Sequence, residues 1–108
     1  MKFPNDENGA LLHEMHEAGV DLSQPLNVDF FLIFKTEKEA GAMIAALEAS
    51  GETITTTLEK NEIHDDWELC CTINMTPTHA TITLRELQFA KLAEKHNGQG
   101  DGWGVMEE

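Results

Sequence analysis

The feature that most constrains the fold is a segment that is apolar at consecutive positions. Val28 and every residue from Phe30 to Phe34 are apolar, between a polar Asn27 and Lys35. Side chains of a strand alternate between its two faces, so this strand would present apolar residues on both. Such a strand needs cover on both sides. We therefore predict that residues 27–35 form an interior strand of a sheet.

Apolar spacing and capping residues predict three helices. The second helix begins at a capping box formed by Thr36 and Glu39 and ends at Gly51, where a C-cap glycine belongs. Its apolar residues recur at intervals of three and four, as on one face of a helix. The other two predicted helices run from about Asn8 to Gly19, with Asn5 and Asp6 as possible caps, and from Thr78 or Thr81 to His96.

Three further strands are predicted from alternating apolar residues. They cover residues 52–59, 67–75 and 103–106, and a polar turn joins the first two over residues 60–66. After the first helix the order is strand, helix, strand, strand, helix, strand. This order predicts an α+β fold, a ferredoxin-like βαββαβ antiparallel sandwich with an additional N-terminal helix.

A chain of 108 residues has the size of one domain. We expect a single ferredoxin-like domain over 1–108, with a helix and linker in 1–24 and the sandwich in 25–108. One face of such a sheet carries no helices. Phe31 and Ile33 point to that face, and either the N-terminal helix or a second subunit covers them. We favour the helix, through its apolar stripe, and a monomer. The stripe consists of Leu11, Leu12 and Met15.

The last predicted helix carries two apolar stripes. One contains Ile82 and Phe89, and the other contains Leu84 and Leu87. A helix on a two-layer sandwich needs only one stripe for its sheet. We expect the second stripe to pack on a neighbouring helix. A surface for a partner or a second subunit is the alternative.

The charge balance points to a class of partner. Twenty acidic residues against seven Lys and Arg give a net charge of -13. Such a surface repels phosphate backbones and anionic membranes, so we expect neither nucleic acid nor membrane as a direct partner. It attracts a basic protein segment and speeds the encounter. Acidity that only keeps the protein soluble is the alternative.

The residues do not suggest catalysis. His13 and His16 share a helix face but have no clear third ligand, and His64 with its two aspartates fits a solvated loop. Adjacent Cys70 and Cys71 fall on opposite faces of a strand in acidic surroundings, which disfavours a reactive thiolate. We expect no enzyme activity, no metal and no cofactor. The sequence has no signal peptide at its start, and its cysteines do not form a disulfide framework, so we expect a cytoplasmic protein.

A tryptophan between two glycines, Gly102-Trp103-Gly104, stands close to the end of the chain. Such a ring is either wedged into a core that needs bare backbone on both sides or exposed for a partner. Its position on the last strand, after Asp101, favours a structural role in which Trp103 locks the closing strand.

Several short motifs occur in a fixed order along the chain, and the one that contains Trp103 is the most specific. These motifs are Phe3–Asp6, Asp21–Ser23, Cys71–Thr72, Pro77–His79, Ile82–Thr83, Leu92–Glu94 and Asp101–Gly104. Together they resemble the regulator of ribonuclease E activity B family, which inhibits a bacterial endoribonuclease. Inhibitory relatives carry a long acidic tail after the Trp103 motif, which the present sequence lacks, so we expect a short subgroup.

The resemblance implies a ferredoxin-like fold and an acidic cytoplasmic protein that binds ribonuclease E, through its basic non-catalytic scaffold region, without chemistry on RNA. A small-molecule or metal-binding domain and an acidic charge mimic for another nucleic-acid-binding protein are the alternatives. The candidate partner-binding residues are Asp65, Asp66, Glu68, Leu84, Leu87, Asp101 and Trp103.

Overall fold

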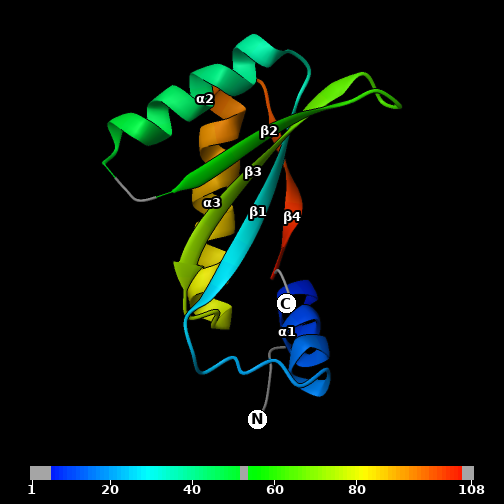
Figure 1. The fold of residues 1–108 in the computed structure, drawn as a ribbon, viewed down its shortest axis with the longest axis vertical. Coiled ribbons are helices and arrows are strands. Elements are labelled where there is room, and N and C mark those ends of the chain that lie inside the picture. Colours follow the sequence, from blue (N-terminus) through cyan, green and yellow to red (C-terminus); the bar gives the residue numbers. More distant parts are fainter. Residues whose placement is uncertain (1–5, 52–53, 106–108) are drawn as a thin grey trace.

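The computed structural model describes residues 6–51 and 54–105. Its four strands form one antiparallel sheet in the order β2-β3-β1-β4, and helices α2 and α3 pack on it (Figure 1). This is the predicted ferredoxin-like arrangement with an additional N-terminal helix, and β1 is an interior strand as predicted. The elements are α1 (Glu7–Glu17), β1 (Leu26–Phe34), α2 (Glu37–Ala49), β2 (Thr55–Asn61), β3 (Asp66–Met75), α3 (His79–Lys95) and β4 (Gln99–Val105).

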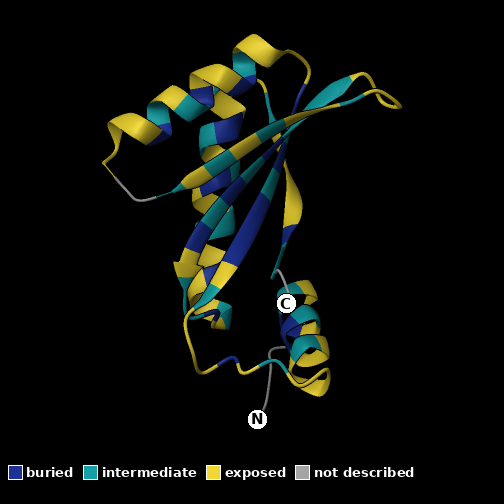
Figure 2. Ribbon diagram, in the orientation of Figure 1, coloured by how far each residue is buried: buried dark blue, intermediate teal, exposed yellow. Residues whose placement is uncertain are grey.

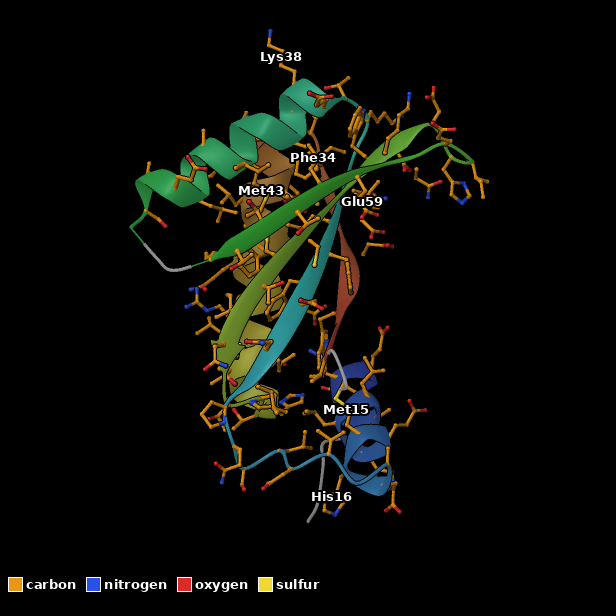
Figure 3. All side chains as sticks on the ribbon, in the orientation of Figure 1. Met15, His16, Phe34, Lys38, Met43 and Glu59 are labelled. Carbon is orange, nitrogen blue, oxygen red and sulfur yellow. The ribbon has the colours of Figure 1, made fainter. Side chains whose placement is uncertain are left out.

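The core lies between the sheet and the two helices. The alternate β1 residues Val28, Phe30, Leu32 and Phe34 all belong to this face and are at most 2% exposed. The ring of Phe30 meets that of Phe89 on α3, with centroids 5.1 Å apart. Figure 2 shows the buried stretches along β1 and β3, and Figure 3 labels Phe34 and Met43 in this core region. The opposite face of the sheet carries no helix (Figure 1).

Each helix begins at a side chain that caps its free N–H groups. Asp6 accepts a hydrogen bond from the Gly9 N–H at the start of α1, at 2.8 Å. The Thr36 hydroxyl oxygen accepts one from the Glu39 N–H at the start of α2, as the sequence predicted. Thr78 caps α3, which settles the choice between the two threonines. These caps define the helix starts because the first N–H groups have no partner within the helix.

The junction between α3 and β4 depends on a glycine. The Gly98 N–H donates a hydrogen bond to the Ala93 carbonyl at 2.7 Å, and Asn97 adopts a positive φ of 62°. A Cβ atom at Gly98 would lie 2.4 Å from the ring of Phe34. Only glycine lets the chain turn this close to the core ring.

Strand β4 begins at Gln99, four residues before the predicted start at Trp103. It pairs Trp103 with Phe30 and Gly100 with Leu32, so two β4 residues lie opposite Phe31. This is a β-bulge, and its second residue, Gly102, has a φ of 104°. The bulge directs Trp103 to the core face, where it is 7% exposed, so its structural role is confirmed. The predicted strand positions Met106 and Glu52 lie outside the described residues.

The expectation that the N-terminal helix covers the open sheet face is wrong. Helix α1 packs on α3 and lies beyond the end of β4 (Figure 1). Its Leu12 is 1% exposed within the core cluster, while the Asn8 amide nitrogen donates hydrogen bonds to Thr83 and Glu86 of α3. These polar contacts place α1 at the end of the sandwich.

The expectation that the second stripe of the last helix packs on a neighbouring helix is also wrong. Leu84 and Leu87 are 55% and 51% exposed. They lie on the side of α3 opposite Ile82 and Phe89, which face the sheet. Helix α1 contacts α3 at Thr83 and Glu86, away from these leucines, and no other described residue covers this side.

Candidate partner-binding surfaces

The open face of the sheet presents an apolar centre. Because paired strand residues share a face, Phe31 and Ile33 of β1 lie beside Cys70 and Glu68 of β3 respectively. Both apolar side chains are only half-buried, and a Cβ atom at Gly104 would lie 4.0 Å from the Phe31 ring. The ring therefore spreads toward the bare backbone of β4. It leaves a shallow apolar surface in the middle of the sheet.

Acidic residues surround this centre. Glu59 of β2 lies directly opposite Glu68 of β3 on the open face, and Glu68 in turn lies opposite Ile33. Figure 3 labels Glu59 on β2, apart from the core residues Phe34 and Met43. Two like charges directly opposite each other destabilise a sheet. No hydrogen bond or ion pair joins either glutamate to a cation within the described residues.

The carboxylate of Asp29 adds a further charge near the centre. Asp29 is 8% exposed and accepts a hydrogen bond from the Thr72 hydroxyl at 2.5 Å. Cys70 is half-buried on the same face, two residues before Thr72 on β3. Burial, and to a lesser extent the charges of Asp29 and Glu68, raise the pKa of the Cys70 thiol. The thiol therefore stays protonated at neutral pH and belongs to the surface as a weakly polar group.

A cavity of about 440 Å³ opens where this face meets the β2–β3 turn and the α3–β4 junction. Ile33 lines it together with Asp66, His64 and Gln99, and Lys35 stands at its margin. The Oδ1 atom of Asp66 is buried and accepts no hydrogen bond within the described residues. A buried carboxylate oxygen without a donor is uncommon, because it has lost its water without a replacement. Asp66 and Ile33 thus give the cavity one acidic and one apolar lining residue.

The sequence-predicted acidic residues near the turn lie at this same end of the sheet. Asp65 has a φ of 52° in the turn, lines the cavity and contacts the ammonium of Lys60 at 3.4 Å. Asp66 and Glu68 follow it at alternate positions on the open face of β3. Strand alternation and the β2–β3 turn thus bring three of the seven predicted residues together.

The other predicted residues lie elsewhere. Leu84 and Leu87 are on the outer side of α3, with the sheet between them and the open face. Lys91, Glu94 and Lys95 also lie on the exposed side of this helix, so this side carries both signs of charge. Asp101 is exposed in the β4 bulge, opposite Phe31 at the edge of the open face. Trp103 is buried in the core, so it does not offer its own side chain to a partner. Any effect of Trp103 on binding is indirect, through the position of neighbouring residues of β4.

The sequence was compared with models of known protein families, and the match covers nearly the whole chain. A family model described as regulator of ribonuclease activity B, RraB, matches residues 5–105. The chain belongs to the RraB family. The matched segment spans all three helices and all four strands of the structure. A search of curated proteins returned no match.

The RraB family regulates ribonuclease activity and is not itself a catalytic family. Helix α1 of this RraB chain contains the His13–Glu17 pair, with the atoms 3.7 Å apart. Over residues 6–51 and 54–105, no three His, Cys, Asp or Glu side chains converge as metal ligands. The helices within those residues are too short or too polar to cross a membrane.

Sequence reasoning missed Glu59 and the cavity in this RraB chain. Glu59 was assigned to a strand, but its position opposite Glu68 depends on the register of β2 against β3. That register depends on the length of the turn between the two strands. The sequence predicted a polar turn over residues 60–66 but did not determine its exact length. The α3–β4 junction contributes Gln99 from the far end of the chain, and no local pattern connects it with Asp66.

Proposed function

We propose that the protein binds ribonuclease E through the basic, non-catalytic region of the nuclease and lowers or redirects its activity. The observation that carries the proposal is the family match over residues 5–105. The net charge of -13 supports it, because a strongly acidic surface is complementary to an Arg-rich segment. Binding then changes which partners or transcripts the nuclease engages.

The mode of action in this proposal is protein binding rather than chemistry on RNA. An acidic protein repels the phosphate backbone, so direct competition for the RNA substrate is disfavoured. The two cysteines are unpaired, and Cys71 is fully buried, which is compatible with the reducing cytoplasm where the nuclease acts.

Binding to the purified scaffold region of ribonuclease E, measured by isothermal titration calorimetry, tests the proposal. We expect a complex at low salt whose affinity falls at physiological salt, because screening weakens contacts between exposed charges. An RNA-cleavage assay with full-length nuclease should then show altered cleavage, and a nuclease that lacks the scaffold region should be unaffected. Absence of a complex at both salt concentrations would contradict the proposal.

A further inference from the structure

The open face of the sheet combines features that a folded protein does not need for its own stability. Phe31 and Ile33 are only half-buried at its centre, and the N-terminal helix does not cover them. Glu59 and Glu68 stand opposite each other without a cation within the described residues. The exposed apolar centre and the paired like charges both favour occupation of this face by another molecule.

The charge of the face restricts what that molecule can be. The open-face positions of β1, β2 and β3 contain four carboxylates, and Asp101 lies in the β4 bulge opposite Phe31. The one strand cation, Lys60, lies on the other face against the Trp67 ring at 5.9 Å, while Lys35, directly after β1, lines the cavity at one end. A second copy stacked face to face would bring these carboxylates against each other. Nucleic acid and anionic lipid are repelled for the same reason. A cationic polypeptide remains. The four carboxylates are Asp29, Glu59, Asp66 and Glu68.

The same reasoning separates this face from the outer side of α3. The exposed Leu84 and Leu87 also offer apolar surface, but Lys91 and Lys95 share their helix face. A cationic segment is attracted to the sheet face and repelled from these lysines. The two surfaces lie on opposite sides of the molecule, so one short segment cannot contact both.

We infer that the open sheet face is the docking surface for an Arg-rich segment that also carries apolar side chains. This inference rests on the proposed function and deepens it, since it names the surface that receives the basic region of the nuclease. The cations of the segment pair with Glu59 and Glu68 and separate their charges. An apolar side chain of the segment lies on Phe31 and Ile33.

A pair of charge-neutral variants tests the assignment. Glu59→Gln with Glu68→Gln removes the two central charges, and Glu48→Gln with Glu94→Gln removes two exposed charges from α2 and α3. Both variants change the net charge equally, so they alter long-range attraction by the same amount. The probes are the ribonuclease E scaffold region and a synthetic peptide of alternating Arg and Leu, each measured by calorimetry at physiological salt.

We expect the Kd of the open-face variant to rise about tenfold for both probes and that of the control to stay within about twofold of wild type. The open-face variant should melt no lower than wild type, because the substitution removes a like-charge pair. Weaker binding by a protein that is equally or more stable identifies contact residues, since a merely structural role would lower the melting temperature.

Cys70 provides an independent footprint because it lies on the same face beside Phe31. Alkylation of Cys70 by iodoacetamide, followed by mass spectrometry, should slow several-fold when either probe is added at saturation. A Cys70→Ser variant gives the background, since Cys71 is buried in the core.

The outcomes separate the inference from the proposed function. Binding of the scaffold region with equal weakening in both variants, or without protection of Cys70, overturns the open-face assignment and leaves the function intact. If the scaffold region does not bind, the proposed function is overturned. The affinities of the two variants for the peptide then test whether the open face binds cationic segments. A peptide that does not bind, or that binds both variants alike, overturns the inference too.

Discussion

The indole nitrogen of Trp103 donates a hydrogen bond to the side-chain oxygen of Asn8 at 2.9 Å, joining the last strand to the first helix. The amide nitrogen of Asn8 donates to Thr83 at 3.1 Å and to Glu86 at 2.8 Å. One asparagine therefore connects α1, α3 and β4 across 95 positions of the chain. This explains how a short helix with one fully buried leucine keeps a defined place at the end of the sandwich.

Removal of this hydrogen bond should lower the free energy of unfolding, while the folded protein should keep its affinity for the partner. Trp103→Phe keeps most of the ring and loses the donor, and should lower the free energy of unfolding by about 1–2 kcal/mol. Trp103→Ala also leaves a cavity and should cost about 3–5 kcal/mol. Urea unfolding measures both. A double-mutant cycle with Asn8→Ala should give a coupling of about 1 kcal/mol. A Trp103 variant that melts like the parent but no longer binds would assign the tryptophan to the interface.

Two glycine-to-alanine substitutions should have opposite effects. Gly98→Ala places a Cβ 2.4 Å from the Phe34 ring and should destabilise the protein by about 1–3 kcal/mol through overpacking. Gly41→Ala lies in the exposed interior of α2 with no atom within 4 Å, and should stabilise it by about 0.4–1 kcal/mol. Thermal melts of both proteins distinguish the steric cause from a general effect of glycine replacement. Equal shifts would contradict the packing seen at the α3–β4 junction.

The contribution of Asp6 should depend on pH. The hydrogen bond from the Gly9 N–H, together with His79 at 2.8 Å, holds the pKa of Asp6 below its ordinary value of 3.8. A lowered pKa in the folded state stabilises the protein above pH 3.8, and this stabilisation is lost as the pH falls through the lowered pKa. Asp6→Asn keeps a side chain that can cap the helix but removes the charge. The variant should therefore be less stable than wild type near neutral pH, and the difference should vanish in acid.

The two cysteines should react at different rates. Burial raises the pKa of Cys71 to about 12, so almost no thiolate forms at neutral pH and the reagent also lacks access. Cys70 is half-buried and should react slowly in the native protein, whereas Cys71 should react only on unfolding. Mass spectrometry after timed alkylation, with Cys70→Ser as the control, measures both rates. Fast labelling of both thiols in the native protein would contradict the packing of β3.

The exposed leucines of α3 should tolerate polar replacement. Leu84→Gln and Leu87→Gln should each change the free energy of unfolding by no more than about 0.5 kcal/mol, because both side chains are already more than half exposed. Their binding to the ribonuclease E scaffold region should match wild type. A loss of binding in these variants, with the fold intact by circular dichroism, would place the partner on α3 instead of on the open face.

The sequence by itself determined the fold class. Consecutive apolar residues from Phe30 to Phe34 require cover on both sides, which makes β1 an interior strand. The capping threonine Thr36 marks the start of α2, because local hydrogen bonds depend only on near neighbours, whereas the choice between Thr78 and Thr81 for α3 was left to the structure. The order of elements then leaves few antiparallel arrangements. For the site, the sequence named Asp65, Asp66 and Glu68 as candidates around the turn, and the structure placed Asp66 with Glu68 on one face by beginning β3 at Asp66.

Only the tertiary structure decided where surfaces lie relative to one another. The position of Glu59 opposite Glu68 depends on strand register. The early start of β4 depends on the bulge at Gly102. The place of α1 depends on contacts from Asn8 to distant residues. Each of these joins groups that are far apart in the sequence or sensitive to a shift of one residue, and a one-residue shift moves a side chain to the other face. Local patterns carry no information about such choices, because the competing arrangements use the same residues and the same periodicity.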